Sequence, residues 1–259
     1  MIFPGQASQF VGMARDLAET PGAGADFLSS VESILGEDLT GIMFDGPGDV
    51  LTETRNAQPA ILAHSVAVAL ALRQMDIIPS VVAGHSLGEF SAAVAADALA
   101  PADGLRIVRK RGELMFAAGQ EIPGTMAAVM GLSGDQVAEV CAAVSAQGKV
   151  VVLANHNSAA QVAISGEVEA VAAAGEALKE AGARRVIPLN VSGAFHSPLL
   201  AGASSAFTDF LADITVKDVE VPLIANVSAS RVTAGAELKD GWCRQLTSPV
   251  LWHDSRDTL

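Results

Sequence analysis

The chain has 259 residues, half of them hydrophobic and 17% charged, which suits one large α/β domain, with or without a smaller insert. Its 16 basic and 29 acidic residues give a formal net charge of −13, which argues against broad binding to nucleic acids or anionic membranes. Cys141 and Cys243 form no C-x-x-C motif and indicate a reducing compartment without a metal framework. Without a leader-like start or a bilayer-spanning apolar run, the sequence predicts a cytoplasmic protein.

The first eighty residues are predicted to alternate between short apolar segments, turns and helices. In chain order these are a strand, a turn, a helix broken at Pro21 and Gly22, a loop and a second helix, over residues 1–3, 4–9, 13–35, 38–56 and 59–75. The second helix (PAILAHSVAVALALRQM) is apolar nearly all round, so we expect it to be buried. His64 within it is expected to be a core or interface residue rather than a catalyst.

A strand, a sharp turn and a helix follow over residues 81–92, which read VVAGHSLGEFSA. The G-x-S-x-G pattern puts small residues two before and two after Ser86, where strand and helix cross closely. This geometry strains the serine backbone and exposes its hydroxyl over the carboxyl edge of a sheet. The N–H of Leu87 would then point to where an oxyanion could be held. The alternative is a chance match in a chain with 24 glycines, but the flanking elements favour Ser86 as a nucleophile.

The helix predicted after Pro101 carries an arginine on its apolar face. Residues at helical spacing form its buried stripe, namely Leu105, Val108, Gly112 and Met115. Arg111 shares this stripe, whereas the other charges of the helix are expected to be solvated: Arg106, Arg109, Lys110 and Glu113. An inward-facing arginine needs an anion, because an unpaired buried charge is costly. Two interpretations stay open: a structural ion pair, or a site that grips a substrate carboxylate bidentately.

From residue 123 the pattern changes to that of a smaller unit. Strands are predicted over 125–132, 149–154, 161–165 and 184–189, and residues 155–160 are predicted as a polar turn. One helix opens with a capping box at Ser133 and Gln136 and runs to about 146, and another covers 167–181 and is closed by Gly182. The order β-α-β-β-α-β is that of a ferredoxin-like unit inserted into the larger domain.

The chain then returns to the larger domain. A loop, a helix and a strand are predicted over 194–198, 199–211 and 221–225, and the chain ends in what looks like the middle of a helix.

The serine hydroxyl needs a base to take its proton. Among the five histidines, His85 should point away from its neighbour Ser86, His156 lies in the insert, and His253 lies in an exposed segment. His196, in a loop after a strand, is the best candidate by elimination, although spacing alone does not decide it. No Asp or Glu stands out as an orienting third member, so a backbone carbonyl could do that job.

Six motifs, in this order, resemble those of the malonyl-CoA:acyl-carrier-protein transacylases and the acyltransferase domains of polyketide synthases. They are FPGQASQ (3–9), GHSLGEFSAA (84–93), RKRGELM around Arg111, NHNSAAQVAISG (155–166), VSGAFHS (191–197) and RQLTSPVLW (244–252). The resemblance covers essentially the whole chain. It implies malonyl transfer from malonyl-CoA, a coenzyme A thioester, to the phosphopantetheine arm of an acyl carrier protein, without a metal or redox cofactor.

The resemblance also implies a role for particular residues. Ser86 is similar to the nucleophile that carries the malonyl ester, His196 to the general base and acid, and the backbone carbonyl of Gln245 to the group that orients the histidine. The amides of Gln6 and Leu87 are similar to an oxyanion hole. Arg111 resembles the arginine that grips the malonyl carboxylate. Further residues match positions around the substrate: Gln58, His85, Asn155, Asn157 and Phe195. Phe195 before the histidine resembles malonyl-selecting enzymes and should disfavour an α-methyl group.

The implied architecture is an α/β-hydrolase-like domain of residues 1–122 and 190–259 with a ferredoxin-like subdomain of residues 123–189. The sequence departs from the family at Ala7, where a glycine is usual, which is costly if the position needs a positive φ. The first few and the last few tens of residues of the family are also missing, so we expect a truncated C-terminus.

A local basic patch is expected to dock the carrier protein, because the whole chain is acidic. The candidate patches are Arg106, Arg109 and Lys110, or Lys179, Arg184 and Arg185. We expect a monomer. Two alternatives remain: a serine esterase or thioesterase, in which water accepts the acyl group, and an idle carrier-binding module. The sequence does not distinguish fatty acid from polyketide synthesis.

Overall fold

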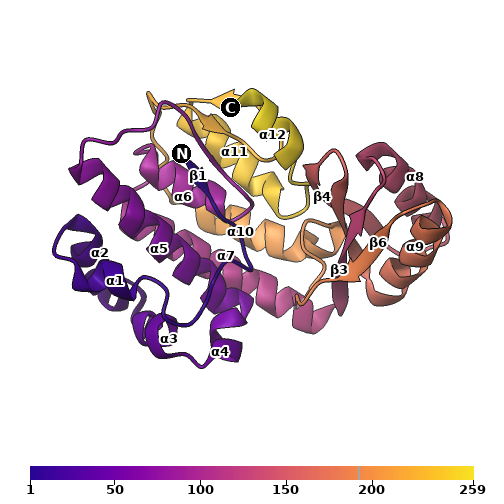
Figure 1. Cartoon of the computed structure of the whole chain (residues 1–259), viewed down its shortest axis with the longest axis horizontal. Coiled ribbons are helices and arrows are strands. Elements are labelled where there is room, and N and C mark those ends of the chain that lie inside the picture. The colour runs from indigo at the N-terminus through magenta and orange to yellow at the C-terminus, as the bar shows by residue number, and fades with distance from the viewer. Residues whose placement is uncertain (192) are drawn as a thin grey trace.

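The computed structural model describes residues 1–191 and 193–259 and has an α/β architecture with two β-sheets. One sheet has the strand order β1 (Ile2–Phe3), β2 (Val82–Gly84), β7 (Leu223–Ile224), β8 (Arg231–Val232). Strands β1, β2 and β7 are parallel and β8 is antiparallel to β7. The other sheet is antiparallel and lies to one side of the molecule, on the right in Figure 1.

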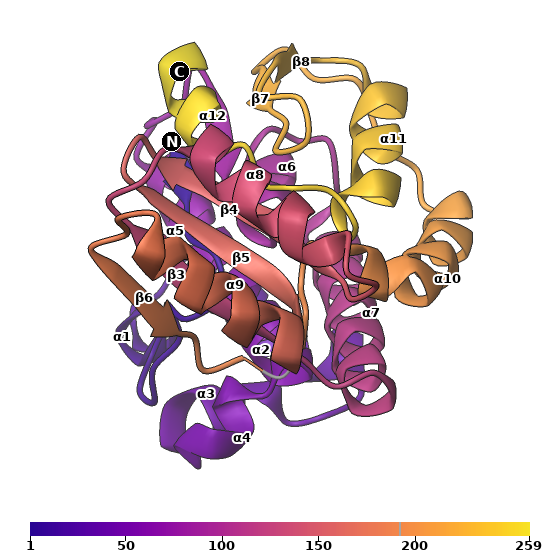
Figure 2. The same ribbon diagram turned by 90° about the vertical axis from the view of Figure 1, so that its right-hand side faces the viewer.

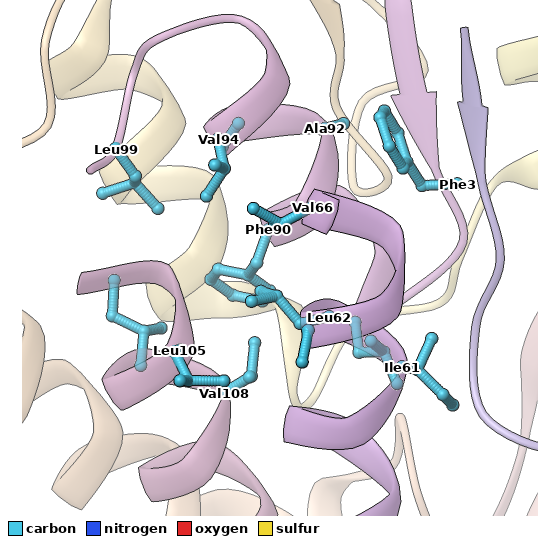
Figure 3. Packing of buried hydrophobic residues seen from close by; sticks show 14 of the residues in the cluster. Phe3, Ile61, Leu62, Val66, Phe90, Ala92, Val94, Leu99, Leu105 and Val108 are labelled. Atoms are coloured by element: carbon cyan, nitrogen blue, oxygen red, sulfur yellow. The ribbon is translucent and has the colours of Figure 1, made fainter. Parts of the chain in front are cut away.

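Helices surround the first sheet and supply most of its core. In chain order they are α1 (Arg15–Glu19), α2 (Ala23–Leu35), α3 (Leu39–Asp45), α4 (Gly48–Thr52), α5 (Thr54–Gln74), α6 (Gly88–Ala95), α7 (Pro101–Glu121), the 3₁₀ turn η1 (Pro198–Leu200), α10 (Ala201–Ala212), α11 (Gly235–Gln245) and α12 (Trp252–Thr258). Phe90 of α6 lies between Leu62 of α5 and Leu105 of α7, and all three are fully buried (Figure 3). The long helices α5 and α7 therefore pack against α6, the helix that follows the serine turn.

The segment predicted as a loop over 38–56 is largely helical, so that prediction was wrong. Asp38 caps α3, since its Oδ1 accepts a hydrogen bond from the N–H of Gly41 at 2.7 Å. Leu39 and Met43, one turn apart, are buried beneath this helix. Helices α3 and α4 are too short to show a helical period, and the turn at residues 45–48 that does separate them dominated the sequence pattern.

Helix α5 begins at Thr54, before the predicted start, and contains Pro59. Proline has no N–H, so it cannot bond to the carbonyl of Arg55 one turn earlier. Arg109 of α7 replaces that bond, with Nη1 2.7 Å from the Arg55 carbonyl oxygen, and it also pairs with Glu37 and with Glu113. The side chain of Arg109 is only 16% exposed. The prediction that it is an ordinary solvated charge was therefore wrong.

The expected burial of α5 applies to its first part, because the helix emerges toward solvent after residue 67. His64 lies half-buried in this helix, and burial lowers the pKa of its imidazole. None of the helices in residues 1–191 and 193–259 is long and apolar enough to cross a membrane.

The second sheet has the predicted element order, β-α-β-β-α-β. The elements are β3 (Gly124–Met130), α8 (Gly134–Ser145), β4 (Val151–Ser158), β5 (Gln161–Glu167), α9 (Val168–Glu180) and β6 (Arg185–Pro188), with strand order β4-β5-β3-β6. Helices α8 and α9 cover one face of the sheet (Figure 2) and enclose a separate apolar core that includes Val129 and Ile164. The capping box at Ser133 and Gln136 is confirmed, and Gly182 follows α9 at φ 100°.

Most of the polar turn predicted over 155–160 is instead a continuation of strand β4, so that prediction was wrong. The pairing of β4 with β5 shifts register after Leu153 and after His156, and these irregularities accommodate polar side chains in the strand. Asn155 also bridges to Val250, and the N–H of His156 donates to the Val250 carbonyl at 2.9 Å. These bonds attach the second sheet to the segment before α12.

Candidate active site

The serine turn lies between β2 and α6, where β2 ends at Gly84 and α6 begins at Gly88. A Cβ on Gly84 would overlap the backbone of Gly88, and a Cβ on Gly88 would lie 2.6 Å from the backbone oxygens of Phe3 and Pro4. Glycine is therefore required at both positions. Ser86 has a φ of 51°, in the left-handed region that non-glycine residues seldom adopt. This is the strained backbone that the motif predicts.

Asn226 lies two residues after the end of β7 and holds this strained turn in place. Its Oδ1 accepts the N–H of Ser86 at 2.7 Å, and its Nδ2 donates to the carbonyl of Gly84 at 2.7 Å. The amide thus spans the turn from one side to the other. Since the side chain is fully buried, both bonds are shielded from water.

Ser86 and His196 are brought together from positions 110 residues apart. The Oγ of Ser86 lies 2.9 Å from Nε2 of His196, while Nδ1 lies 3.0 Å from the Gln245 carbonyl oxygen and 3.2 Å from that of Ser248. Because carbonyls only accept, Nδ1 carries the proton and Nε2 is free to accept one. Burial, followed by the nearby charge of Arg111, lowers the pKa of His196 to about 3, so the imidazole is neutral at pH 7.

Arg111 is buried and reaches the same hydroxyl from α7. Its Nη2 lies 3.1 Å from Ser86 Oγ and 2.9 Å from Gln245 Oε1, and its Nη1 lies 2.7 Å from Gln58 Oε1. The described part of the chain places no carboxylate in direct contact with Arg111 and no acceptor at its Nε. Burial lowers the pKa of Arg111 to about 9, and Glu89 opposes this effect. The guanidinium is therefore held by neutral oxygens rather than by a structural ion pair.

Two backbone amides near Ser86 in the fold have no hydrogen-bond partner among the described residues. Within residues 1–191 and 193–259, neither the N–H of Gln6 nor that of Leu87 donates a hydrogen bond. Leu87 immediately precedes α6, so its N–H is among those a helix start leaves unpaired. The side chain of Gln6 is fixed by a 3.1 Å bond from its Nε2 to Thr54 Oγ1. The next residue, Ala7, has a φ of 77°, which confirms that this position needs a left-handed backbone.

A cavity of about 410 Å³ opens onto Ser86 and His196. Its wall comes from both sheets and their connections and includes Gln6, His85, Asn155, Asn157 and Phe195. His85 turns its Nε2 to Asn157 Oδ1 at 3.0 Å and packs edge-on against Trp252, so it is directed away from the serine hydroxyl as expected. Gln58 lies outside the wall, buried behind Arg111. Ser192, within the 191–197 motif, lies outside the described residues.

Sequence reasoning missed several residues of this site. Glu89, Asn226 and Trp242 form a buried polar layer beneath Ser86, and the Ser248 carbonyl is a second acceptor for His196. A polar residue just after a buried strand, such as Asn226, is a usable signal, because the carboxyl ends of parallel strands share one edge. Glu89 gave no signal beyond its place in the motif. No group of three or more His, Cys, Asp or Glu residues suited to a metal ion occurs in the part of the chain that the structure describes.

A serine hydrogen-bonded to a neutral histidine, with a buried arginine beside it, is an arrangement suited to nucleophilic catalysis on a substrate that carries a negative charge. The acyl transferase domain family matches residues 1–258. The chain is 42% identical over 258 residues to the malonyl CoA-acyl carrier protein transacylase of Bacillus subtilis (strain 168), covering 100% of this chain and 81% of that protein. It is 40% identical over 259 residues to the transacylase of the same name from Staphylococcus aureus (strain MSSA476), with 100% and 83% covered.

Solved structures give the same result. An acyl carrier protein S-malonyltransferase from Vibrio cholerae superposes with a TM-score of 0.94 at 40% identity, covering 99% of this chain and 84% of that one. A malonyl-transacylase in complex with a type II PKS acyl-carrier protein superposes with a TM-score of 0.92 at 38% identity, covering 97% and 82%. The chain belongs to the acyl transferase domain family, and the resemblance inferred from its motifs is confirmed.

Proposed function

We propose that this protein transfers the malonyl group of malonyl-CoA to the phosphopantetheine thiol of an acyl carrier protein through an ester on Ser86. The observation that carries this proposal is the position of Ser86 Oγ, 2.9 Å from His196 Nε2 and 3.1 Å from Arg111 Nη2. The hydroxyl of Ser86 thus lies within hydrogen-bond distance of a base, His196, and of a cation that can bind a carboxylate, Arg111. The names of the relatives, which are malonyl transacylases, support the same donor and acceptor.

In the first step, neutral His196 takes the proton of Ser86 as Oγ attacks the thioester carbonyl. The oxyanion that forms is stabilised by the N–H groups of Gln6 and Leu87. The carbon–sulfur bond then breaks, and His196 returns the proton to the departing thiol of coenzyme A. The carbonyl oxygens of Gln245 and Ser248 hold the proton on Nδ1 and stabilise the imidazolium while it exists.

In the second step, His196 takes the proton of the carrier thiol, whose sulfur attacks the ester. The same amides stabilise the second oxyanion. The carbon–oxygen bond breaks, Ser86 recovers its proton from His196, and the malonyl thioester leaves on the carrier protein. These steps use no metal or redox cofactor. The phosphopantetheine is part of the carrier protein.

Arg111 would bind the free carboxylate of the malonyl group. Its planar guanidinium can offer two parallel N–H groups to a carboxylate, and its Nε has no partner among the described residues. Gln58 would keep the guanidinium aligned. Phe195 would limit space at the α-carbon, and His85, Asn155 and Asn157 would line the path of the pantetheine arm.

The finer architecture follows the same proposal. Residues 1–122 and 190–259 would form the α/β-hydrolase-like domain and residues 123–189 the ferredoxin-like subdomain, with the catalytic cavity between them. We propose a cytoplasmic monomer. Of the two basic patches, Lys179, Arg184 and Arg185 is the better docking surface for an acidic carrier protein. Arg184 and Arg185 are exposed, whereas Arg109 is engaged with Glu37 and Glu113.

The test is to load the protein with radiolabelled malonyl-CoA, remove the excess, and add phosphopantetheinylated acyl carrier protein. Transfer of the label to the carrier faster than its release as malonate supports the proposal. Release as malonate at the same rate with and without the carrier would indicate a thioesterase instead. Failure of the protein to take up any label would indicate an idle module. Ser86→Ala, which removes only the attacking oxygen, is the matched control and should carry no label.

A further inference from the structure

Glu89 is a buried carboxyl group that the proposed reaction does not use. It lies in the first turn of α6, three residues after Ser86, and is 1% exposed. Its Oε1 lies 3.0 Å from Trp242 Nε1, and its Oε2 lies 3.0 Å from the N–H of Asn226 and 2.9 Å from Gln245 Nε2. All of these described partners are donors. A carboxylate satisfies them all, whereas a protonated carboxyl would point its own proton at a donor. Burial raises the pKa of Glu89 to about 7, and these three hydrogen bonds oppose that rise, so the contacts favour the ionised form.

The carboxylate is joined to Arg111 through one amide. The Nε2 of Gln245 donates to Glu89, and the Oε1 of the same side chain accepts from Arg111 Nη2 at 2.9 Å. The Nε2 also lies 3.3 Å from the Ser86 carbonyl oxygen. If the amide turned over, its NH₂ would face the guanidinium and its oxygen would face the carboxylate. Glu89 and Arg111 therefore fix the orientation of Gln245 between them.

Glu89 partly compensates the charge of Arg111 without bonding to its guanidinium. A carboxylate in direct contact would form a bidentate pair with the guanidinium and compete with an incoming carboxylate. Placed one amide away, Glu89 still lowers the energy of the buried cation, and it raises the pKa of Arg111 against the effect of burial. The guanidinium stays charged, and no carboxylate of the described residues competes with that of the substrate.

We propose that Glu89 is a positioning residue for substrate recognition: it acts through the side-chain amide of Gln245 to keep Arg111 charged and aligned for the acyl group's carboxylate. This inference rests on the proposed function, because it concerns the same acyl donor. It adds a role for the Gln245 side chain that is separate from the role of its backbone carbonyl. Glu89 touches neither the substrate nor His196, so its effect should depend on Arg111.

The test compares acylation by malonyl-CoA with acylation by p-nitrophenyl acetate, which has no carboxylate for Arg111. Glu89→Gln keeps the size of the side chain and removes its charge. It should slow malonyl labelling of Ser86 about tenfold, within the range expected for coupled neighbours, and leave the p-nitrophenolate burst within about twofold. In an Arg111→Ala background, Glu89→Gln should cause no further loss of malonyl labelling. This non-additivity is what a purely structural role would not produce.

A second variant covers the case in which Glu89→Gln disturbs folding. In Glu89→Gln with Trp242→Phe, the donor that faces Oε1 is absent, so the new NH₂ group has no donor opposite it. The burst should then be retained while malonyl labelling stays slow.

Equal losses with both acyl donors, or a full additional loss in the Arg111→Ala background, would overturn the inference. If the parent is malonylated and Glu89→Gln reacts equally fast, only this inference fails. If the parent forms no malonyl ester, the proposed function fails and the inference fails with it.

Discussion

Ser86 Oγ and His196 Nε2 lie 2.9 Å apart although both residues hold a left-handed backbone, with φ values of 51° and 57°. For a residue other than glycine, this conformation costs roughly 1–2 kcal/mol. Asn226 holds the serine turn, and the carbonyls of Gln245 and Ser248 hold the histidine ring. The surrounding bonds thus impose a geometry that neither residue would adopt alone.

Replacement of His196 should remove the base and leave the fold. His196→Asn is the suitable change, because asparagine tolerates a left-handed backbone better than most residues. We expect the rate of Ser86 malonylation to fall by about 10²–10⁴-fold, as is typical for the loss of a general base. Rapid-quench mass spectrometry measures this rate. A loss of less than about tenfold would mean that another group takes the proton.

The same histidine should make the protein sensitive to acid. Its pKa is lowered to about 3 in the folded state, mainly by burial, and is about 6.5 when unfolded, so the unfolded chain binds more protons between these values. The stabilisation from neutral His196 is therefore present above pH 6.5 and lost as the pH falls toward 3. Glu89, whose pKa burial raises to about 7, has the opposite slope between pH 4.5 and 7.

A comparison of two proteins isolates the histidine, because Glu89 is present in both. The melting temperature of His196→Asn relative to the parent should rise steadily as the pH is lowered from 7 to 4. Differential scanning fluorimetry across this range checks the trend. If the melting temperatures of the two proteins differ by the same amount at every pH, His196 is not buried in the neutral form.

Ala7 should be a site where glycine stabilises the protein. At φ 77° an L-residue costs roughly 1–2 kcal/mol, and glycine adds about 0.4–1 kcal/mol of chain entropy to the unfolded state. Ala7→Gly should therefore raise the free energy of unfolding by up to about 1.5 kcal/mol, as measured by urea titration. Ala146→Gly is the matched control, since Ala146 is also exposed but has a φ of −61°. It should lower stability by about 0.5–1 kcal/mol. Equal effects at both positions would contradict the backbone argument.

Phe195 should control the size of the α-substituent. Its buried ring borders the cavity next to His196. Phe195→Ala should raise the methylmalonyl-to-malonyl ratio of labelling rates by about 10–100-fold, because one methyl group is worth about 1–3 kcal/mol in a fitted pocket. Competition between the two thioesters, read by intact mass, gives the ratio directly. An unchanged ratio would mean that selectivity arises elsewhere.

Local sequence signals predicted the elements that surround the site. The small residues around Ser86, the apolar stripe of α7 that includes Arg111, and the capping box at Ser133 each reflect a short-range requirement. Such requirements are visible in a single sequence because they depend on spacing along one element. The errors, at α3, α4 and β4, fell where helices are short or where a strand carries polar residues.

Long-range partners were not predictable in the same way. Arg109 was assigned to solvent because its partners Glu37 and the Arg55 carbonyl come from other segments. Glu89 and Asn226 bond to each other across 137 residues, and only the folded chain brings them together. The charge and orientation of such groups follow from burial, which spacing does not encode.

Intact-mass spectrometry after brief mixing with malonyl-CoA, and in parallel with acetyl-CoA, tests the central claim most directly. The parent should gain one malonyl group and react poorly with acetyl-CoA, because only malonyl offers a carboxylate to Arg111. Ser86→Ala should gain nothing, and Arg111→Ala should be malonylated much more slowly. A malonyl adduct that persists in Ser86→Ala, or equal labelling of the parent by both thioesters, would contradict the account.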